Sequence, residues 1–281
     1  MRRAGVDVRD LRGRVALVTG AASGIGRASA LAFARRGADL ALCDVDERGL
    51  AETAESARAL GREVLAQRVD VADAGAMAGF AGAVHARWPA VDVLMNNAGV
   101  GLGASFLDTS LADWEWIRGV NELGVVHGCH FFVPAMVRAG GPRHVVNVAS
   151  MAGYVPSVTL AAYTMTKYAV VGLSESLRME LAPHGIGVTA ICPGIIDTPI
   201  VRNAPLRGAA DVPGARERMA ELYRRRGYGP ERVAENVLRA IARNRAVAPV
   251  SPEAWTFWFL KRLSPGAVRA LMAFADRRGR G

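Results

Sequence analysis

Short apolar runs alternate with amphipathic stretches along most of the chain. Each apolar run is rich in Val, Leu, Ile and Ala and has the length of a buried strand, while each amphipathic stretch repeats its apolar residues at helical spacing. The predicted strands cover residues 14–19, 39–43, 63–69, 91–95, 143–149 and 187–192. The predicted helices cover residues 27–36, 47–60, 74–87, 111–137, 161–182 and 215–225.

This alternation predicts an α/β fold in which helices cover both faces of a parallel sheet. We expect a Rossmann-type, doubly wound, three-layer αβα domain over residues 10–250, followed by a helical C-terminal tail over residues 251–281. In such folds the ligands bind at the carboxyl ends of the strands. The residues that fall at those ends are Gly20, Asp44, Asp70, Asn96, Ser150 and Pro193.

The first predicted strand runs into a glycine-rich turn and then into a helix. The turn reads Gly20-Ala-Ala-Ser23-Gly24-Ile25-Gly26. Glycines let the backbone turn sharply and approach a pyrophosphate, to which the helix N-terminus offers free N–H groups. A glycine pattern in this context indicates dinucleotide binding, with Gly20, Ser23, Gly24, Ile25 and Gly26 as the predicted contacts.

The second predicted strand ends at Asp44, where folds of this type hold the adenosine ribose. A carboxylate there accepts hydrogen bonds from the ribose hydroxyls and repels a 2′-phosphate. Neither Ala22 nor Ser23 places a positive charge in the glycine turn, and Arg48 lies about one helical turn further on. The sequence therefore favours NAD, with NADP the less favoured cofactor.

Tyr163 and Lys167 are four residues apart and so share one face of a predicted helix. An ammonium near a phenol favours the phenolate and lowers the tyrosine pKa, which suits the phenol to general acid/base catalysis. Ser150 follows the apolar run before this helix and is placed to hydrogen-bond the same substrate oxygen. The alternative for a lone Tyr-x-x-x-Lys pair is a Lys that extends past a packed aromatic ring.

Lysine usage favours the catalytic interpretation. The chain has 35 Lys and Arg residues, yet Lys167 and Lys261 are its two lysines. An amine kept where the chain otherwise uses guanidinium groups indicates a role that Arg cannot fill.

Taken together, these motifs resemble those of the short-chain dehydrogenase/reductase family over roughly residues 10–250. The matching residues are Thr19-Gly-Ala-Ala-Ser-Gly-Ile-Gly26, Asp70, Asn96-Asn-Ala-Gly99, Asn121, Ser150, Tyr163-x-x-x-Lys167 and Pro193-Gly194 with Thr198.

The resemblance implies a role for each catalytic residue. It makes Tyr163 the general acid/base, and it has Lys167 lower the pKa of Tyr163 and hold the nicotinamide ribose. It has Ser150 polarise the substrate oxygen, and Asn121 support a water relay behind Lys167. It also implies further cofactor contacts from Asp70, Val71, Asn97, Ala98, Gly99, Pro193, Gly194, Ile196 and Thr198.

We therefore expect an NAD(P)-dependent oxidoreductase that exchanges a hydride between the cofactor and a secondary alcohol or ketone. The predicted pocket walls are mostly apolar, which favours a small apolar substrate. They are Gly101, Met151, Tyr154, Ile195 and Val201, with Leu102 and Val155. Tyr154 has no Lys four residues on, so it is not a second acid/base candidate, and residues 198–229 are expected to form a lid. The alternatives are an NADP-dependent carbonyl reductase of the same fold and a non-catalytic NAD-sensing protein.

Composition bounds the class of protein. Hydrophobic residues make up 51% of the chain, which predicts a large core. Residues 1–13 are polar and charged, so we expect no signal peptide. The three cysteines lie in apolar surroundings, as buried thiols do in the reducing cytoplasm, and the five histidines form no recognisable metal-ligand pattern.

The formal net charge of +9 belongs to the C-terminal part of the chain. From residue 202 onward there are 17 Arg or Lys against 7 Asp or Glu, without a nucleic-acid recognition motif. The aromatic and basic tail at residues 255–275 is too interrupted to span a bilayer. It is expected either to pack on protein or to lie on an anionic membrane surface. The family resemblance further implies a homodimer or homotetramer formed through the long helices that carry Asn121 and Tyr163.

Overall fold

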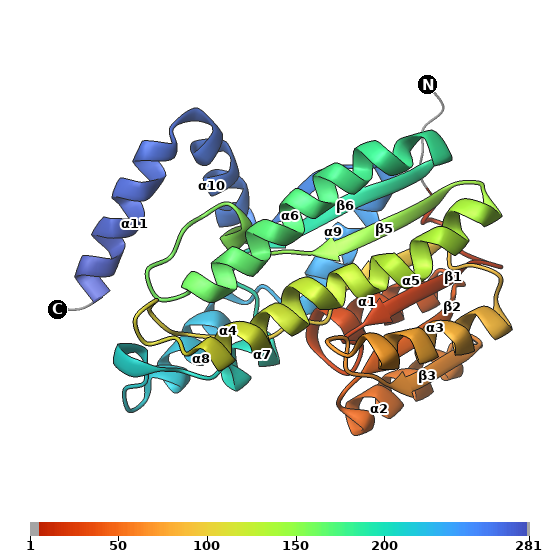
Figure 1. Ribbon diagram of the computed structural model, residues 1–281, viewed down its shortest axis with the longest axis horizontal. Helices are drawn as coiled ribbons and strands as arrows, with labels where there is room; N and C mark the ends of the chain where they lie inside the picture. The colour runs from red at the N-terminus through yellow and green to blue at the C-terminus, as the bar shows by residue number, and fades with distance from the viewer. Residues whose placement is uncertain (1–5, 280–281) are drawn as a thin grey trace.

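Seven parallel strands form one sheet in the order β3-β2-β1-β4-β5-β6-β7 (Figure 1). The computed structural model describes residues 6–279. The strands are β1 (Val15–Thr19), β2 (Asp39–Asp44), β3 (Val64–Arg68), β4 (Val93–Asn96), β5 (Arg143–Val148), β6 (Ile186–Pro193) and β7 (Val247–Val250). This arrangement confirms the predicted Rossmann-type, three-layer fold.

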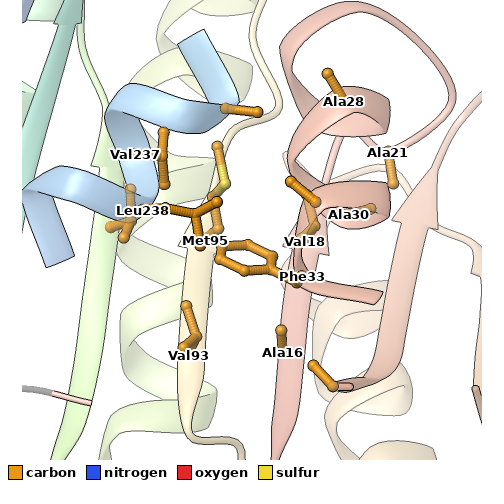
Figure 2. Close-up of a cluster of buried hydrophobic side chains, with 14 of the residues drawn as sticks. Ala16, Val18, Ala21, Ala28, Ala30, Phe33, Val93, Met95, Val237 and Leu238 are labelled. Atoms are coloured by element: carbon orange, nitrogen blue, oxygen red, sulfur yellow. The ribbon is translucent and has the colours of Figure 1, made fainter. Parts of the chain in front are cut away.

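Helices cover both faces of the sheet, so the strands can be apolar on both sides. Helices α1 (Gly24–Arg35), α2 (Glu47–Ala59) and α9 (Pro230–Ala242) cover one face, and α3 (Ala74–Arg87), α5 (Gly124–Ala139) and α6 (Ala161–Leu181) cover the other. Figure 2 shows the first of the two cores, where Phe33 of α1 packs between Val18 and Met95 of the sheet and Val237 of α9.

The strand order reverses between β1 and β4, because β1 pairs with β2 on one side and with β4 on the other. A reversal of this kind opens a crevice at the carboxyl ends of the strands, where ligands of open α/β sheets bind. Gly20 directly follows β1, Asp44 ends β2, Asn96 ends β4 and Pro193 ends β6. Their predicted place at one edge of the sheet is therefore confirmed.

One predicted helix, over residues 111–137, is interrupted in the structure. It consists of α4 (Leu111–Arg118), a π-helical turn η1 (Gly119–Leu123) and α5. The wider turn carries Asn121, and insertions of this kind often lie at functional sites. The helix α9 and the strand β7 were absent from the prediction, as was the short helix after β6 at residues 199–203.

The segments after β6 include the predicted lid and the tail. The lid contains α7 (Pro199–Asn203), a short η4 (Gly208–Ala210) and α8 (Ala215–Arg226). The tail is a hairpin of α10 (Pro252–Leu263) and α11 (Pro265–Gly279) that extends from the body of the molecule beside α6 (Figure 1). Within residues 6–279, no helix has the length and apolar character needed to cross a membrane.

Candidate active site

The glycine turn is shaped by close backbone packing. Gly20 has a φ of +66°, which residues with a Cβ rarely adopt, and a Cβ on Gly26 would lie 2.0 Å from the carbonyl oxygen of Gly20. Helix α1 begins at Gly24, three residues before its predicted start, so its free N–H groups face the turn. Ser23 precedes the helix and makes no side-chain cap, and Ile25 packs against the core.

The Asp44 carboxylate is fixed at the end of β2. One oxygen accepts a hydrogen bond from the Ala22 N–H at 2.8 Å, and the other accepts one from the Asp46 N–H at 3.0 Å. These bonds use part of the acceptor capacity of the carboxylate and hold it beside the glycine turn.

The turn is also tied to the end of β4. The Asn97 amide donates to the carbonyl oxygens of Thr19 and Gly20, at 2.9 and 3.0 Å, and the Thr19 hydroxyl accepts from the N–H groups of Asn97 and Ala98. Two strand ends are thus joined into one rigid edge.

Ser150, Tyr163 and Lys167 meet at the carboxyl end of β5. The Tyr163 phenol forms a hydrogen bond with Ser150, and the Lys167 Nζ lies 5.6 Å from the centroid of the Tyr163 ring. Lys167 is 3% exposed, and its Nζ donates to the carbonyl oxygen of Val148 at 3.0 Å. The three residues predicted from the sequence therefore form one cluster.

Burial sets the proton affinities of this cluster. It raises the pKa of Tyr163 to about 12, which the hydrogen bond with Ser150 opposes, and it lowers the pKa of Lys167 to about 8. The pKa of Tyr163 is thus displaced in the direction opposite to the predicted one, because loss of solvent outweighs the favourable hydrogen bond.

Asn121 joins the π turn to the rest of the cluster. Its side chain is fully buried, accepts from the Val100 N–H at 2.7 Å and donates to the Val100 carbonyl oxygen at 2.9 Å. It also donates to the Thr166 hydroxyl at 3.3 Å, one residue before Lys167. A Cβ on Gly99 would lie 3.2 Å from the Asn121 Oδ1 and 3.5 Å from the Lys167 Nζ, which shows how closely these groups pack.

The remaining predicted cofactor contacts lie along the same edge. Asp70 is exposed after β3, and Val71 is buried beside it. Thr198, which is 7% exposed, precedes α7 and lies against Gly24 of the glycine turn. Pro193 ends β6, and Ile196 is buried in the core that α1 shares.

A residue that the sequence reasoning missed holds the loop after β6. Glu253, in the first turn of α10, accepts a hydrogen bond from the Ile195 N–H at 2.9 Å and pairs with Arg226 of α8 at 2.5 Å. A Cβ on Gly194 would lie 2.5 Å from the Glu253 Oε1. One carboxylate therefore connects the tail, the lid helix and the loop that contains Gly194 and Ile195.

The predicted pocket residues differ in their positions. Gly101 lies against Ile200 of α7, Val201 is in α7, and Met151 packs at the edge of the second core. Tyr154 is 4% exposed, donates from its hydroxyl to the Ala254 carbonyl oxygen and packs edge-on against Trp258. We therefore correct its assignment from substrate pocket to anchor of the tail.

Next to Tyr163 lies a third, smaller apolar cluster. It is built from Leu102, Ala104, Ile117 and Ala162, with Val100 and Trp114 packed against it. Tyr223 of the lid helix α8 is close enough to raise the pKa of Tyr163 further. Sequence reasoning named Leu102 among these residues and missed Trp114 and Tyr223, which come from segments distant in the sequence.

Known proteins of similar sequence and fold identify the family of the chain. The model of the family described as short chain dehydrogenase matches residues 14–207. The chain belongs to the short-chain dehydrogenases. The family comprises enzymes that act on CH–OH groups, and relatives of the chain are named oxidoreductase and dehydrogenase.

Two mycobacterial relatives and one solved structure illustrate the match. The short-chain dehydrogenase is 40% identical over 90% of its length to "Probable oxidoreductase EphD" of Mycobacterium tuberculosis, of which it spans only 43%. It is 37% identical to "Putative oxidoreductase SadH" of the same species, with 93% of this chain and 94% of the relative covered. A short-chain dehydrogenase/reductase from Burkholderia phymatum, solved in complex with NAD, is 35% identical with a TM-score of 0.81, covering 90% of this chain and 94% of that one.

Proposed function

We propose that this short-chain dehydrogenase interconverts a secondary alcohol and a ketone on an apolar substrate, with NAD as the preferred cofactor. The observation that carries the proposal is the convergence of Ser150, Tyr163 and Lys167 at the strand edge that also holds the glycine turn. A proton donor and a dinucleotide site side by side are what a hydride-transfer enzyme requires.

The residues at this edge fit a dinucleotide. A Cβ on Gly20 or Gly26 would collide with neighbouring backbone, and glycines packed in this way let the turn approach a pyrophosphate in other folds of this type. The Asp44 carboxylate would accept hydrogen bonds from the adenosine ribose hydroxyls and repel a 2′-phosphate. The Burkholderia relative solved with NAD supports the same choice. When bound, the nicotinamide supplies the acceptor or donor of the hydride.

Tyr163 would move the proton. In the oxidation direction its phenolate takes the alcohol proton, and in reduction the phenol returns a proton to the carbonyl oxygen. Ser150 would hydrogen-bond the same oxygen, and Lys167 would favour the phenolate and bind the nicotinamide ribose. Because burial alone raises the pKa of Tyr163, the positive charges of Lys167 and of an oxidised nicotinamide would be needed to offset it.

The third apolar cluster supports the choice of substrate. Leu102, Ile117 and Ala162 are buried next to Tyr163, and Trp114 packs against them. A substrate carbon skeleton beside the phenol would meet these apolar groups, which provide no partners for the hydroxyls of a sugar or for a phosphate.

Replacement of Tyr163 with Phe tests the proton transfer. We expect the rate of NAD-dependent oxidation of apolar secondary alcohols to fall by roughly 10²- to 10⁴-fold, because the general acid/base is lost. NADH binding, followed by fluorescence titration, should change little. The matched control is Tyr154→Phe, which removes a hydroxyl that bonds to the tail. Full activity of Tyr163→Phe on a verified substrate would refute the assignment.

A further inference from the structure

A surface cleft lies between α6, the edge strand β7 and the tail helix α10, away from the strand edge that holds Tyr163. Its volume is about 310 Å³. The lining residues come from all three elements and from the turn before β7: Glu175, Arg245, Ala246, Val247, Trp255, Trp258 and Arg262. Nothing in the proposed dehydrogenase chemistry uses this cleft.

Two arginines in the cleft stack on two tryptophans. The Arg245 guanidinium carbon lies 5.1 Å from the ring centroid of Trp255, and that of Arg262 lies 4.0 Å from the ring centroid of Trp258. Within the described part of the chain, neither guanidinium forms an ion pair with a carboxylate, although Glu175 lines the same cleft. The stacking orients two cationic groups whose hydrogen-bonding N–H groups have no acidic partner.

A row of apolar side chains continues from the cleft along α10. Trp255 stacks on Phe259 with ring centroids 5.7 Å apart, and Leu263 follows one helical turn later. Phe259 is 56% exposed and Leu263 is 84% exposed, and Leu271 of the adjoining α11 is 45% exposed. Arg262 lies three residues after Phe259 and therefore flanks this row on α10, and Arg269 is exposed on α11. Large apolar and cationic side chains exposed side by side on a helix are typical of a helix that lies in a membrane interface.

We propose that the α10–α11 hairpin binds anionic lipid, with the phosphate of the headgroup held between Arg245 and Arg262 and the Trp255–Phe259–Leu263 row entering the interface. Guanidinium groups bind phosphate oxygens through paired N–H donors, and the cleft carries two of them against one carboxylate. The part of the chain from residue 202 onward, with 17 Arg or Lys against 7 Asp or Glu, is attracted to an anionic surface. The exposed apolar row favours lipid over free phosphate, because a free ion would not contact it.

The test compares vesicles of phosphatidylcholine mixed with phosphatidylglycerol with vesicles of phosphatidylcholine alone. The full chain should co-sediment with the mixed vesicles, and this binding should weaken as salt is added. The double variant Arg245→Gln/Arg262→Gln should bind the mixed vesicles roughly thirtyfold more weakly, because each of the two basic residues near an anionic membrane contributes about 1 kcal/mol. Phe259→Ser/Leu263→Ser should also lose binding. The control is Leu60→Ser, whose side chain is 41% exposed at the end of α2.

Free phosphate distinguishes the two sources of the anion. Inorganic phosphate and glycerol phosphate are titrated against the protein while tryptophan fluorescence is recorded, since Trp255 and Trp258 lie in the cleft. Saturable binding of these ions without vesicle binding would reassign the cleft to a free phosphate compound and overturn the lipid proposal. Failure to bind either would overturn it as well. The two double variants are also compared with wild type by light scattering. If they change the oligomeric mass but still bind vesicles, the surface is an interface between copies of the chain and the lipid proposal is wrong.

Discussion

Lys167 is a buried residue of the site whose side chain can carry a charge. Its side chain is 3% exposed, burial lowers its pKa to about 8, and its ammonium donates to the Val148 carbonyl oxygen. A guanidinium in its place would be larger and would remain charged, since its pKa is above about 12. This explains in physical terms why a chain that otherwise relies on Arg has a lysine here. The rarity of lysine in the sequence had already indicated a special role for Lys167. Helix periodicity had predicted that Tyr163 lies on the same helix face as Lys167.

The pH dependence of the reaction follows from the pKa of Tyr163. Oxidation needs the phenolate and should become faster as the pH rises, whereas reduction needs the phenol and should become slower. The hydrogen bond with Ser150 lowers the pKa of Tyr163 against the effect of burial. In Ser150→Ala the phenolate should therefore be harder to form, with roughly tenfold less of it at a given pH. Absorbance titration of tyrosinate in the cofactor-free protein, with Tyr163→Phe subtracted, measures this directly. An unchanged titration would show that Ser150 does not act on the phenol.

Asp44 is expected to select the cofactor. Asp44→Ala should weaken NADH binding by about tenfold, because hydrogen bonds from the ribose to a charged acceptor are lost. NADPH binding should improve, since the repulsion of the 2′-phosphate is removed. The matched control is Asp46→Ala, two residues on, which removes the carboxylate that caps α2 through the Gly49 N–H. The same ratio of NADH to NADPH affinity in Asp44→Ala and wild type would exclude this role.

At the scale of elements, the lid helix is connected to the site through Glu253. Its carboxylate bonds to the Ile195 N–H and pairs with Arg226 at the end of α8. In Glu253→Gln we expect α8 to open more often, because the ion pair is lost, and the KM for the cofactor to rise several-fold while the fold is kept. The opening is measured without cofactor as the rate of trypsin cleavage in α8, which has Arg at positions 216, 218, 224, 225 and 226.

Glu217→Gln serves as the control for this prediction. It removes an exposed carboxylate from the same helix, and the same trypsin sites remain. A trypsin rate in Glu253→Gln equal to that of wild type and Glu217→Gln would mean that the contact does not restrain the lid.

Prediction at this scale succeeded where the hydrophobic period is regular. The apolar strands and the helices that carry Phe33 and Tyr163 were predicted because their burial follows one period throughout. The π turn around Asn121 was not predicted, because a single wider turn leaves the spacing of apolar residues along the sequence almost unchanged. Glu253 was not recognised because its partner is a backbone N–H 58 residues earlier, which no local pattern shows. The helix α9 did carry a signal, with Pro230 at its start and Val233, Val237 and Ile241 on one face, but it was not used.

At the scale of the whole molecule, the long helices expose a second apolar surface. Trp116, Leu123, Val126, Met165 and Tyr168 come from α4, η1, α5 and α6, and each is between 38% and 42% exposed. These helices lie side by side over one face of the sheet (Figure 1). Exposed large apolar residues gathered on adjoining helices are typical of contacts between subunits.

We therefore expect the protein to form a dimer or tetramer through this surface. Val126→Glu places a charge in its middle and, if the interface is two-fold, places it near its own copy, so the assembly should dissociate. Light scattering coupled to size exclusion should then report the monomer mass, against a larger mass for wild type. Because Asn121 lies in the turn between α4 and α5, dissociation should also reduce activity by loosening this turn. Leu60→Glu, which charges an exposed position at the end of α2, is the control. If the wild-type protein is monomeric at every concentration tested, this surface is not a subunit interface. The π turn would then be stabilised by the Asn121 hydrogen bonds and not by a neighbouring subunit.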